Sequence, residues 1–438
     1  MAAFVIVSNS PMSVLLQVDE DIMDFAYSEK TRDLCLQVQN FFDDHILPRN
    51  ELWHKEVSEG KYPVSFMEDL KALAKSEGLW NLFLPNLQED EPGTRLTNLE
   101  YAPLAEIMGK LMWASEVFNC NAPDTGNMEL LHMFATPEQR VQWLNPLLEG
   151  DIRSAFVMTE PDVASSDATN VQTLIRREGD EYVINGRKWF ITNAAHPNCK
   201  LLILMGKTDP DAATHQQQSM VLIPSDAEGV DMVRNITVLN HFAPEGHCEI
   251  VFRNVRVPVS SILGEEGQGF MLAQARLGPG RIHHCMRSIG QSELALDLMC
   301  ERSQERKTFG KHLHEYSNVA DDIAESRIEI DQARLLVLKT AWMIDEVGAK
   351  AARKEISMIK ALVPRMQCNI TDRAMQVFGA MGLSPDTPLP DLYSWARAIR
   401  YADGPDEVHL RGVARMEIKA SREKLGQAAR YLTLPERL

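Results

Sequence analysis

Side chains suited to binding a flat, polar ligand gather in residues 156–193. The first half of this stretch carries four hydroxyls close together: Thr159, Ser165, Ser166 and Thr169. A loop that offers hydroxyls and backbone N–H groups beside an aromatic wall suits an isoalloxazine ring or an acyl thioester. The alternative is a solvated loop with no ligand.

The second half of the stretch, EYVINGRKWFITN, has the pattern of a β-hairpin. Asn185-Gly186 can take the positive φ angles of a type I′ turn, so the pattern predicts a hairpin that joins residues 181–184 to residues 187–191. This hairpin would hold Phe190 and Thr192 next to the hydroxyl-rich loop.

Three later segments combine residue types that could bind phosphate or move a proton. They read ERKTFGK at 305–311, QVFGAMG at 376–382 and RYADGPDEVH at 400–409. The planar fork of Arg306 could hold two pyrophosphate oxygens, and the glycines of the second segment would let backbone approach a ligand closely. Taken alone, these segments are equally a charged loop, a helix end and a solvated acidic turn.

Composition limits the class of protein. The chain has 438 residues and 45% hydrophobic content, enough for two or three domains with a large core. Its formal charge of −17 makes it a poor binder of nucleic acid or anionic membrane unless its basic residues are concentrated in one patch. Its seven cysteines lack metal-ligand spacing, so we expect reduced thiols, a cytoplasmic location and no metal.

The elements that must position these residues follow from periodicity. Apolar residues at three- and four-residue spacing predict helices in 31–46, 64–79 and 101–108, and Thr136-Pro137 predicts a helix start. Short apolar runs at 201–205, 220–223 and 247–257 predict an antiparallel β-domain. A buried face from Val319 to Ile344 predicts a long helix. The order of glycines in GEEGQG, 264–269, is wrong for a dinucleotide-binding fingerprint and favours a turn.

The order TEP, SSD, NGxKxxITN, RxxFG and QxFGxxG along the chain resembles the acyl-CoA dehydrogenase family. The resemblance implies an α+β multidomain fold with an N-terminal helical bundle, a central antiparallel β-domain and a C-terminal four-helix bundle, with FAD between the last two. It implies a flexible segment at 1–24 and domains at 25–150, 151–265 and 266–438. We expect the apolar first residues to be a frayed start rather than a signal peptide or membrane span.

The resemblance also assigns roles to residues. Those implied to bind FAD are Met158, Thr159, Phe190, Thr192, Arg306, Thr308, Phe309, Gln376, Gly379, Ala380, Pro405 and Glu407. Those implied to bind substrate are Ser165, Ser166, Arg281 and Gly404. Asp403 stands where the family has a Glu base, although Asp is one methylene shorter. Some relatives carry the base just ahead of the position of Arg281, but here that position is Gly280.

The implied reaction is removal of an α-proton and a β-hydride from an acyl-CoA, which gives a trans-2-enoyl-CoA. An FAD hydroxyl and the backbone N–H of Asp403 would stabilise the enolate oxygen, and a desolvated pocket would raise the pKa of Asp403. Electrons would pass to an electron-transfer flavoprotein, and the chain would form a homodimer or homotetramer.

The sequence is most similar to the branch that in animals is fused to an aminoglycoside-phosphotransferase-like kinase. We expect no kinase segment here, because the resemblance runs from about residue 25 to 425. A 4-hydroxyacyl-CoA and a medium- or long-chain acyl-CoA are both candidate substrates. Two alternatives share the fold: a nitroalkane-oxidase-like flavoenzyme, which also uses an Asp base, and a flavin-bearing DNA-binding protein, which the acidic composition disfavours.

Overall fold

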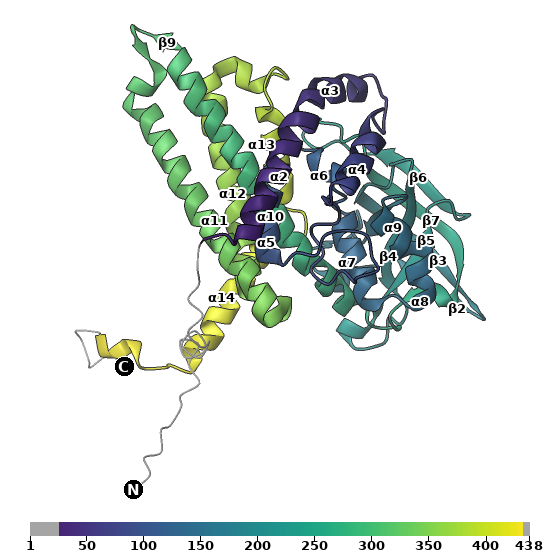
Figure 1. Cartoon of the computed structure of the whole chain (residues 1–438). Helices are drawn as coiled ribbons and strands as arrows, with labels where there is room; N and C mark the ends of the chain where they lie inside the picture. The colour runs from purple at the N-terminus through teal and green to yellow at the C-terminus, as the bar shows by residue number, and fades with distance from the viewer. Residues whose placement is uncertain (1–25, 432–438) are drawn as a thin grey trace.

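A computed structural model describes residues 26–431, apart from the side chain of Pro279. The predicted flexible segment at 1–24 therefore lies outside the described residues. Figure 1 shows short helices in the first part, a twisted sheet on one side and long helices standing together on the other. The predicted order of helical, β and helical parts is confirmed.

The first part is helical, as predicted. Its elements are α2 Glu29–Phe41, η1 Phe42–Ile46, η2 Leu47–Arg49, α3 Asn50–Ser58, α4 Met67–Ser76, α5 Asn98–Gly109, α6 Ala114–Val117, α7 Asp124–Phe134, α8 Pro137–Gln139, η3 Arg140–Leu144 and α9 Asn145–Glu149. The predicted helix start at Thr136 is confirmed: its hydroxyl accepts from the N–H of Gln139, whose side chain accepts from the N–H of Thr136.

The central part is one eight-stranded sheet in the order β6-β7-β3-β2-β4-β5-β8, with β1 against β4. The strands are β1 Arg153–Val157, β2 Leu174–Glu178, β3 Glu181–Thr192, β4 Cys199–Lys207, β5 Gln218–Pro224, β6 Val230–Asn235, β7 His247–Pro258 and β8 Ile262–Leu263. Short helices η4 Ala168–Asn170, η5 Thr214–Gln216 and η6 Val259–Ser261 lie in its connections. The sheet is antiparallel only in part, because β1 and β2 each pair with β4 in parallel.

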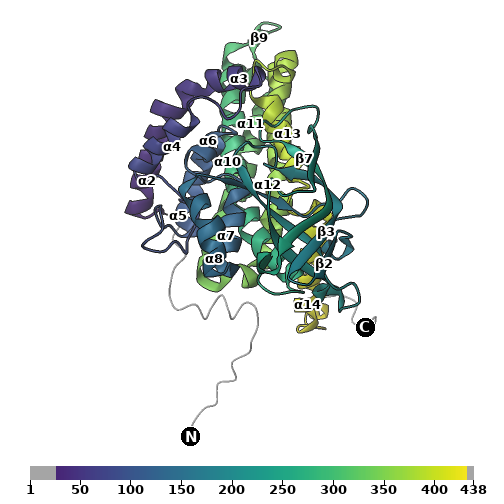
Figure 2. The ribbon, with the colours of Figure 1, turned by 90° about the vertical axis from the view of Figure 1, so that its right-hand side faces the viewer.

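The predicted hairpin at Asn185-Gly186 is wrong. Both residues lie inside the continuous strand β3, which pairs along its length with β7 (Figure 2). Gly186 is needed for another reason: a Cβ there would lie 2.3 Å from Oγ1 of Thr173. The actual hairpin joins β2 to β3 at Gly179, whose φ is 64°.

The last part is built on long helices. Its elements are α10 Gly269–Glu305, β9 Lys307–Thr308, β10 Lys311–His312, η7 Leu313–Glu315, α11 Ser317–Ala351, α12 Arg353–Phe378, η8 Gly379–Leu383, α13 Leu389–Ile399, α14 Asp406–Arg422 and η9 Ala428–Tyr431. The predicted buried face of α11 is confirmed, since Val319, Ile330 and Val337 are buried. Helix α10 packs against α5, α7, α11 and α12, so it joins the first and last parts of the chain.

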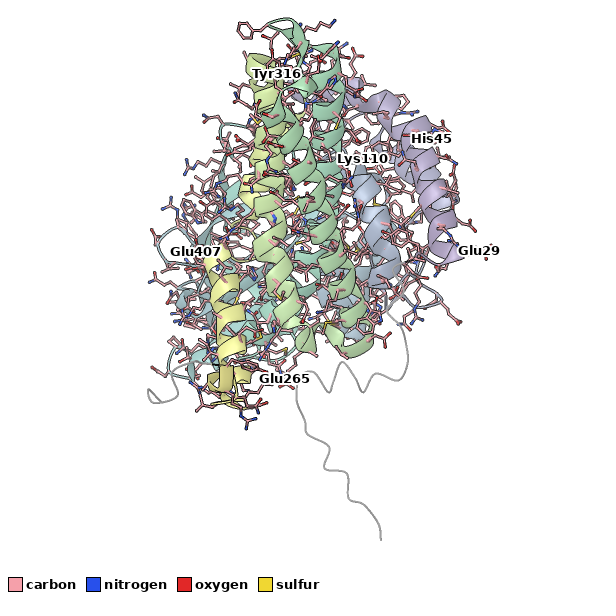
Figure 3. The ribbon with its side chains drawn as sticks, turned by 90° about the vertical axis from the view of Figure 1, so that its left-hand side faces the viewer. Glu29, His45, Lys110, Glu265, Tyr316 and Glu407 are labelled. Carbon is pink, nitrogen blue, oxygen red and sulfur yellow. The ribbon has the colours of Figure 1, made fainter. Side chains whose placement is uncertain are left out.

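Figure 3 shows the long helices side by side, with Tyr316 at one end of the bundle and Glu265 near the other. The GEEGQG segment forms the turn from β8 into α10, as predicted, with φ of 66° at Gly264 and 80° at Gly267. Across residues 26–431, no helix is both long and apolar enough to cross a membrane.

Candidate active site

Asp403 lies in the short loop between α13 and α14, and its backbone has a φ of 55°. This left-handed conformation is uncommon outside glycine, although Asp tolerates it better than most residues. Gly404 follows with a φ of 104°, and a Cβ on it would lie 2.9 Å from Nε2 of His409. The tight turn thus needs glycine after the acid.

Side chains from three helices hold this loop. Nε of Arg281, on α10, donates to the carbonyl oxygen of Asp403 at 2.9 Å, and Nε2 of His409, on α14, lies 3.2 Å from the same oxygen. Nζ of the buried Lys360, on α12, donates to the carbonyl oxygens of Ile399 and Gly404. Within residues 26–431 the backbone N–H of Asp403 has no hydrogen-bond acceptor, so it is free to donate to a ligand.

The carboxylate of Asp403 is tethered by one oxygen. Oδ1 lies 3.3 Å from Nη1 of Arg276, and the side chain is only 11% exposed. Oδ2 is buried, lies 3.6 Å from Nε2 of His284 and has no hydrogen-bond partner among the described residues. On its open side stands Gly280, whose Cβ would lie 3.1 Å from Oδ2.

The expected rise in the pKa of Asp403 is wrong. Burial does raise the pKa of this carboxyl, but the positive charges beside it, Arg276 first among them, bring the pKa below its ordinary value. Burial lowers the pKa of His284 to about 3, so this imidazole is neutral at ordinary pH. The structure therefore presents an ionised carboxylate at neutral pH, which is the protonation state that a base requires.

Met158 and Thr159 follow β1 directly and are fixed by their main chain. Nζ of Lys188 donates to the carbonyl oxygen of Met158 at 2.8 Å, and the N–H of Trp189 donates to that of Thr159 at 3.0 Å. Lys188 is fully buried and is paired with Glu160 at 2.9 Å. Burial lowers the pKa of Lys188 to about 8. Burial raises the pKa of Glu160, but Lys188 and the hydrogen bonds from Thr173 and Gln172 together bring it below its ordinary value.

Phe190 and Thr192 lie at the end of β3 next to this segment. Phe190 has a φ of 52° and is 43% exposed, which is unusual for an aromatic residue on a strand. Oγ1 of Thr192 lies 3.0 Å from Nδ1 of His247. Among residues 26–431, three with positive φ are neither Gly, Asn nor Asp: Phe190, Leu239 and Phe309. Two of them are predicted site residues, and such strain gathers at functional sites.

The two serines of the hydroxyl-rich loop differ. The hydroxyl of Ser165 accepts from the N–H of Glu160 at 2.9 Å, so it closes its own loop. Ser166 is exposed, and none of the described residues hydrogen-bonds its hydroxyl. Arg281 and Gly404, also predicted to bind substrate, both lie beside Asp403.

The predicted pyrophosphate segment is far from Asp403 within one chain. Arg306, Thr308 and Phe309 form the β9–β10 hairpin, which Figure 1 shows at one end of the helical bundle. Arg281 and Arg306 are 25 residues apart in the sequence and mostly on the same helix, a span of roughly 38 Å. Phe309, at the hairpin tip, is 96% exposed with a φ of 46°.

The QVFGAMG segment lies at the same end of the bundle as this hairpin. Arg302 stacks on the ring of Phe378 at 5.1 Å, which brings the end of α10 against the end of α12. Gln376, Gly379 and Ala380 are exposed, and a Cβ on Gly379 would meet nothing within 4 Å. The two predicted phosphate-side segments therefore come together, but apart from Asp403.

The start of α14 carries the last two predicted cofactor residues. Pro405 precedes the helix and Glu407 is exposed. Their neighbour Asp406 is not part of a solvated turn: it is buried and accepts from Nε of Arg365 and Nε of Arg400, each at 2.9 Å. Asp406 thus anchors the helix that follows the Asp403 loop.

Sequence reasoning missed Arg276, His284, Lys360 and His409, which surround Asp403. Arg276 and His284 lie on the same face of α10, eight residues apart, so a helix through GPG at 278–280 would have aligned them. The glycines and proline of that segment instead read as a helix breaker.

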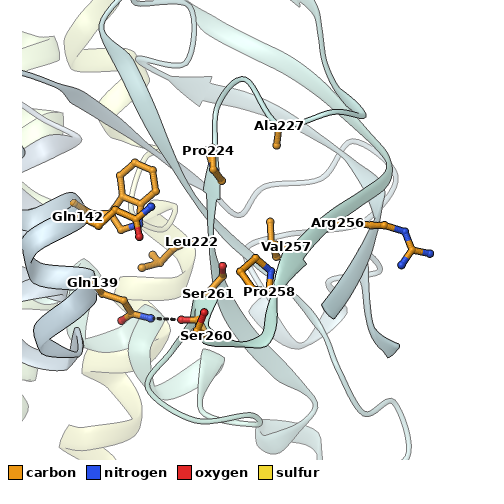
Figure 4. A pocket seen from close by; sticks show the side chains of 11 residues that line it. Gln139, Gln142, Leu222, Pro224, Ala227, Arg256, Val257, Pro258, Ser260 and Ser261 are labelled. Atoms are coloured by element: carbon orange, nitrogen blue, oxygen red, sulfur yellow. Dashed lines mark hydrogen bonds between the residues drawn. The ribbon is translucent and has the colours of Figure 1, made fainter. Parts of the chain in front are cut away.

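Figure 4 shows a pocket between η3 and the sheet, lined by residues that include Gln142, Leu222 and Pro258. None of the predicted site residues lines it, so it is separate from the Asp403 region. No three or more His, Cys, Asp or Glu side chains among residues 26–431 gather where they could hold a metal ion.

The residues present fit a flavin. At the end of β3 stand the exposed ring of Phe190, whose backbone has a positive φ, and the hydroxyl of Thr192. Lys188 of the buried ion pair holds the main chain of Met158, and a free backbone N–H lies in the Asp403 loop. A helical–β–helical chain with a buried carboxylate in a loop between two helices matches the architecture expected of a flavoprotein dehydrogenase.

Comparison with known proteins agrees with that class. The sequence matches the family models for the acyl-CoA dehydrogenase N-terminal domain over 28–151, middle domain over 155–255 and C-terminal domain over 267–417. The chain belongs to the acyl-CoA dehydrogenase family, whose members are FAD-dependent enzymes. The predictions of family, enzyme class and cofactor are confirmed.

Three similar proteins illustrate the relationship. A probable acyl-CoA dehydrogenase, FadE2 of Mycobacterium tuberculosis, is 56% identical over 93% of this chain and 99% of its own length. Acyl-CoA dehydrogenase family member 10 of mouse is 53% identical over 90% of this chain but only 37% of its own length. A solved structure of a putative acyl-CoA dehydrogenase from Mycobacterium abscessus superposes with a TM-score of 0.86 at 47% identity, covering 90% of this chain and 99% of its own.

The chain spans about half or less of the curated animal relatives it matches.

Proposed function

We propose that this chain converts an acyl-CoA thioester into a trans-2-enoyl-CoA, with Asp403 as the base that removes the α-proton. One observation carries the proposal: Oδ2 of Asp403 is buried and has no hydrogen-bond partner among residues 26–431. The lowered pKa of this carboxyl keeps it ionised at neutral pH. Such an oxygen is available to a substrate proton. A solvated surface carboxylate would instead accept hydrogen bonds from water with both oxygens.

The α-proton of a thioester is weakly acidic, so its removal also requires stabilisation of the carbonyl oxygen as charge develops. The free backbone N–H of Asp403 is suited to donate to that oxygen. When bound, FAD would accept the β-hydride. Asp403 would then hold the abstracted proton at Oδ2, while Arg276 keeps Oδ1 in place.

Residues from both sides of the junction would hold the ligands. Met158, Thr159, Phe190 and Thr192 would contact the flavin, and Ser165, Ser166, Arg281 and Gly404 would contact the thioester. Ser166 is the better candidate of the two serines, because the hydroxyl of Ser165 is bonded within its own loop. Pro405 and Glu407, at the start of α14, would lie near the adenosine end.

The phosphate-side residues would serve the site of a second copy of the chain. Arg306, Thr308 and Phe309, with Gln376, Gly379 and Ala380, lie too far along the bundle to reach a cofactor at Asp403 of their own chain. The near-complete exposure of Phe309 supports a surface that a second copy covers. We therefore propose a homodimer or homotetramer.

Electrons would leave to an electron-transfer flavoprotein. We expect a reduced, cytosol-like compartment, because all seven cysteines are free thiols. The acyl group would be a 4-hydroxyacyl or a medium- or long-chain group.

The test is to purify the protein, record its flavin spectrum and add butyryl-, octanoyl- and 4-hydroxyvaleryl-CoA without oxygen. Rapid bleaching of the flavin band by one thioester supports the proposal, and the fastest one indicates the substrate class. A flavin that a nitroalkane reduces, but no thioester does, would overturn it in favour of the nitroalkane-oxidase-like alternative.

The assembly is tested separately by FAD content and sedimentation. Arg306→Ala should release FAD on gel filtration, whereas Lys311→Ala, on the same hairpin, should retain it. A fully loaded Arg306→Ala variant, or a wild-type monomer that holds FAD, would contradict the shared site.

A further inference from the structure

Arg276 lies at a point where all three parts of the chain meet. Its guanidinium stacks on the ring of Phe156, in β1, at 4.6 Å. Its Nε lies 3.3 Å from Oδ1 of Asn127, on α7, and its Nη2 lies 3.3 Å from the carbonyl oxygen of Pro123. Its Nη1 is the group that faces Oδ1 of Asp403.

These contacts leave the guanidinium little freedom. The side chain of Arg276 is 7% exposed, and each of its three nitrogens is directed at a different acceptor. A Cβ on Gly126 would lie 3.0 Å from its Nε, so the backbone of α7 approaches the fork closely. A planar, five-donor fork can satisfy such a set at once, which an ammonium cannot.

The Asp403 side chain needs such support more than a longer acid would. Its loop is fixed through main-chain oxygens by Arg281, Lys360 and His409, but those contacts do not touch the carboxylate. Oδ2 has no hydrogen-bond partner among residues 26–431, its nearest basic group is Nε2 of His284 at 3.6 Å, and Gly280 adds no side chain beside it. Among the described residues, Arg276 is thus the side chain that hydrogen-bonds the carboxylate of Asp403 and limits its rotation.

We infer that Arg276 is a positioning residue for the base: it holds Oδ1 of Asp403 and thereby directs Oδ2 toward the substrate. This inference rests on the proposed function of Asp403. From α10, Arg276 would hold Oδ1 so that Asp403, although shorter than a glutamate, presents Oδ2 at a fixed place. Arg276 therefore joins Phe156 of β1, two residues before Met158, to Asp403.

Among the charged side chains around Asp403, Arg276 lowers the pKa of this carboxyl most, and Arg281 and Lys360 lower it less. Arg281 on α10 and Lys360 on α12 direct their groups to main-chain oxygens of the loop, and His409 on α14 has its pKa lowered by burial to about 4. His284 is likewise neutral, and Asp406 is paired with Arg365 and Arg400. An opposite charge at such a distance lowers a carboxyl pKa by about 1–3 pH units.

The experiment compares the rate of flavin reduction by the best acyl-CoA, as a function of pH, in wild type, Arg276→Gln and Arg276→Lys. The glutamine variant should lose at least about tenfold in rate at neutral pH and shift the acidic limb of the profile upward by about 1–3 units. The lysine variant should keep the limb near its wild-type position but still lose rate, because it retains charge without the fork.

A second readout does not depend on turnover. A 3-thiaacyl-CoA has an acidic α-proton but no β-hydrogen to transfer, so it reports proton removal alone. The absorption band of its bound enolate should appear at higher pH in Arg276→Gln than in wild type. The dissociation constant of the enoyl-CoA product should stay within about threefold, because Arg276 is not proposed to contact the ligand.

The control is Arg334→Gln, which removes an ion-paired arginine of α11 that bonds Glu106 and Glu293 and does not touch Asp403. It should leave both pH profiles unchanged. An acidic limb that does not move in Arg276→Gln would overturn the inference. If the glutamine variant does not fold, Arg276→Lys takes its place as the test, and a wild-type rate in that variant would overturn the inference. A wild-type protein that no acyl-CoA reduces would instead defeat the proposed function.

Discussion

Two segments of the candidate site are held in opposite ways: Met158–Thr159 after β1, the proposed flavin wall, and the Asp403 loop between α13 and α14, the proposed base loop. Met158 and Thr159 directly follow β1; the N–H of Trp189, in β3, donates to the carbonyl oxygen of Thr159, and Lys188 of the buried Lys188–Glu160 pair donates to that of Met158. In the loop, Asp403 has no ladder and is held by side chains that reach it from separate helices. A platform built on strands resists change as a unit, whereas a loop held by side chains can lose one contact at a time.

This comparison predicts that function is lost by different routes on the two sides. Changes in the loop should alter chemistry and leave the cofactor bound. Changes under the wall should release the cofactor and lower stability together. The following predictions test that division, from the largest effect to the smallest.

The largest expected effect is that of Asp403→Asn. The amide cannot accept the α-proton, so the rate of flavin reduction should fall by about 100- to 10,000-fold while FAD content stays at the wild-type level. Stopped-flow spectroscopy without oxygen measures the rate. Asp391→Asn, an exposed acid of α13, is the matched control and should reduce normally. A loss smaller than tenfold would show that the base is elsewhere.

Lys188→Met should have the next largest effect, on the wall. Removal of the Lys188 ammonium leaves the buried carboxylate of Glu160 without an ion-pair partner, which costs about 3–5 kcal/mol of folding free energy. We expect a lower melting temperature, measured by thermal unfolding, and loss of FAD, measured by the flavin-to-protein absorbance ratio. Lys200→Met, on the exposed side of β4, should change neither quantity.

The double variant Lys188→Met with Glu160→Gln sharpens this test. The glutamine oxygen can replace the carboxylate oxygen that accepts from the N–H of Thr173, but not also the one that accepts from the N–H of Gln172. Because the double variant leaves no unpaired buried charge, part of the stability should return. If the single variant instead kept its FAD and its melting temperature, the buried pair would not be what holds the wall.

Gly280→Ala should have a moderate effect in the loop. Its new Cβ would lie 3.1 Å from Oδ2 of Asp403, so the carboxylate must move by a few tenths of an ångström. We expect about tenfold slower flavin reduction, together with equal or higher stability because alanine favours the helix. Gly278→Ala, where a Cβ meets only Ala349 at 3.6 Å, should gain the stability without the loss of rate. Equal rates in both variants would contradict the proposed place of Oδ2.

The same contrast explains what the sequence could reveal. Periodicity and caps were enough for the helices, as α11 and the start of α8 show, because those signals are local. The prediction of a hairpin at Asn185-Gly186 was wrong because Gly186 is required by its close contact with Thr173, which is near in space but lies on another segment. Family resemblance led to Asp403, but the guanidinium that grips it lies 127 residues away in a segment that reads as a helix breaker.

The smallest expected effect is the pH dependence of the rate of flavin reduction by the wild-type protein. It tests whether the pKa of Asp403 is lowered by charge or raised by burial. A carboxyl whose pKa is below its ordinary value stays ionised above that pH, and loses its function only as the pH falls through the lowered pKa. The rate of flavin reduction should therefore change by less than about twofold between pH 8 and pH 5, since an ordinary Asp already titrates near 3.9.

A raised pKa, which desolvation alone would give, predicts the opposite. The rate would then fall about tenfold for each pH unit below that pKa, within the range of the assay. Stopped-flow reduction at a series of pH values, with FAD content checked at each, distinguishes the two. A steep decline between pH 7 and pH 5 with FAD still bound would mean that burial outweighs Arg276, and the base loop would then owe its protonation state to desolvation rather than to the charge that reaches it from α10.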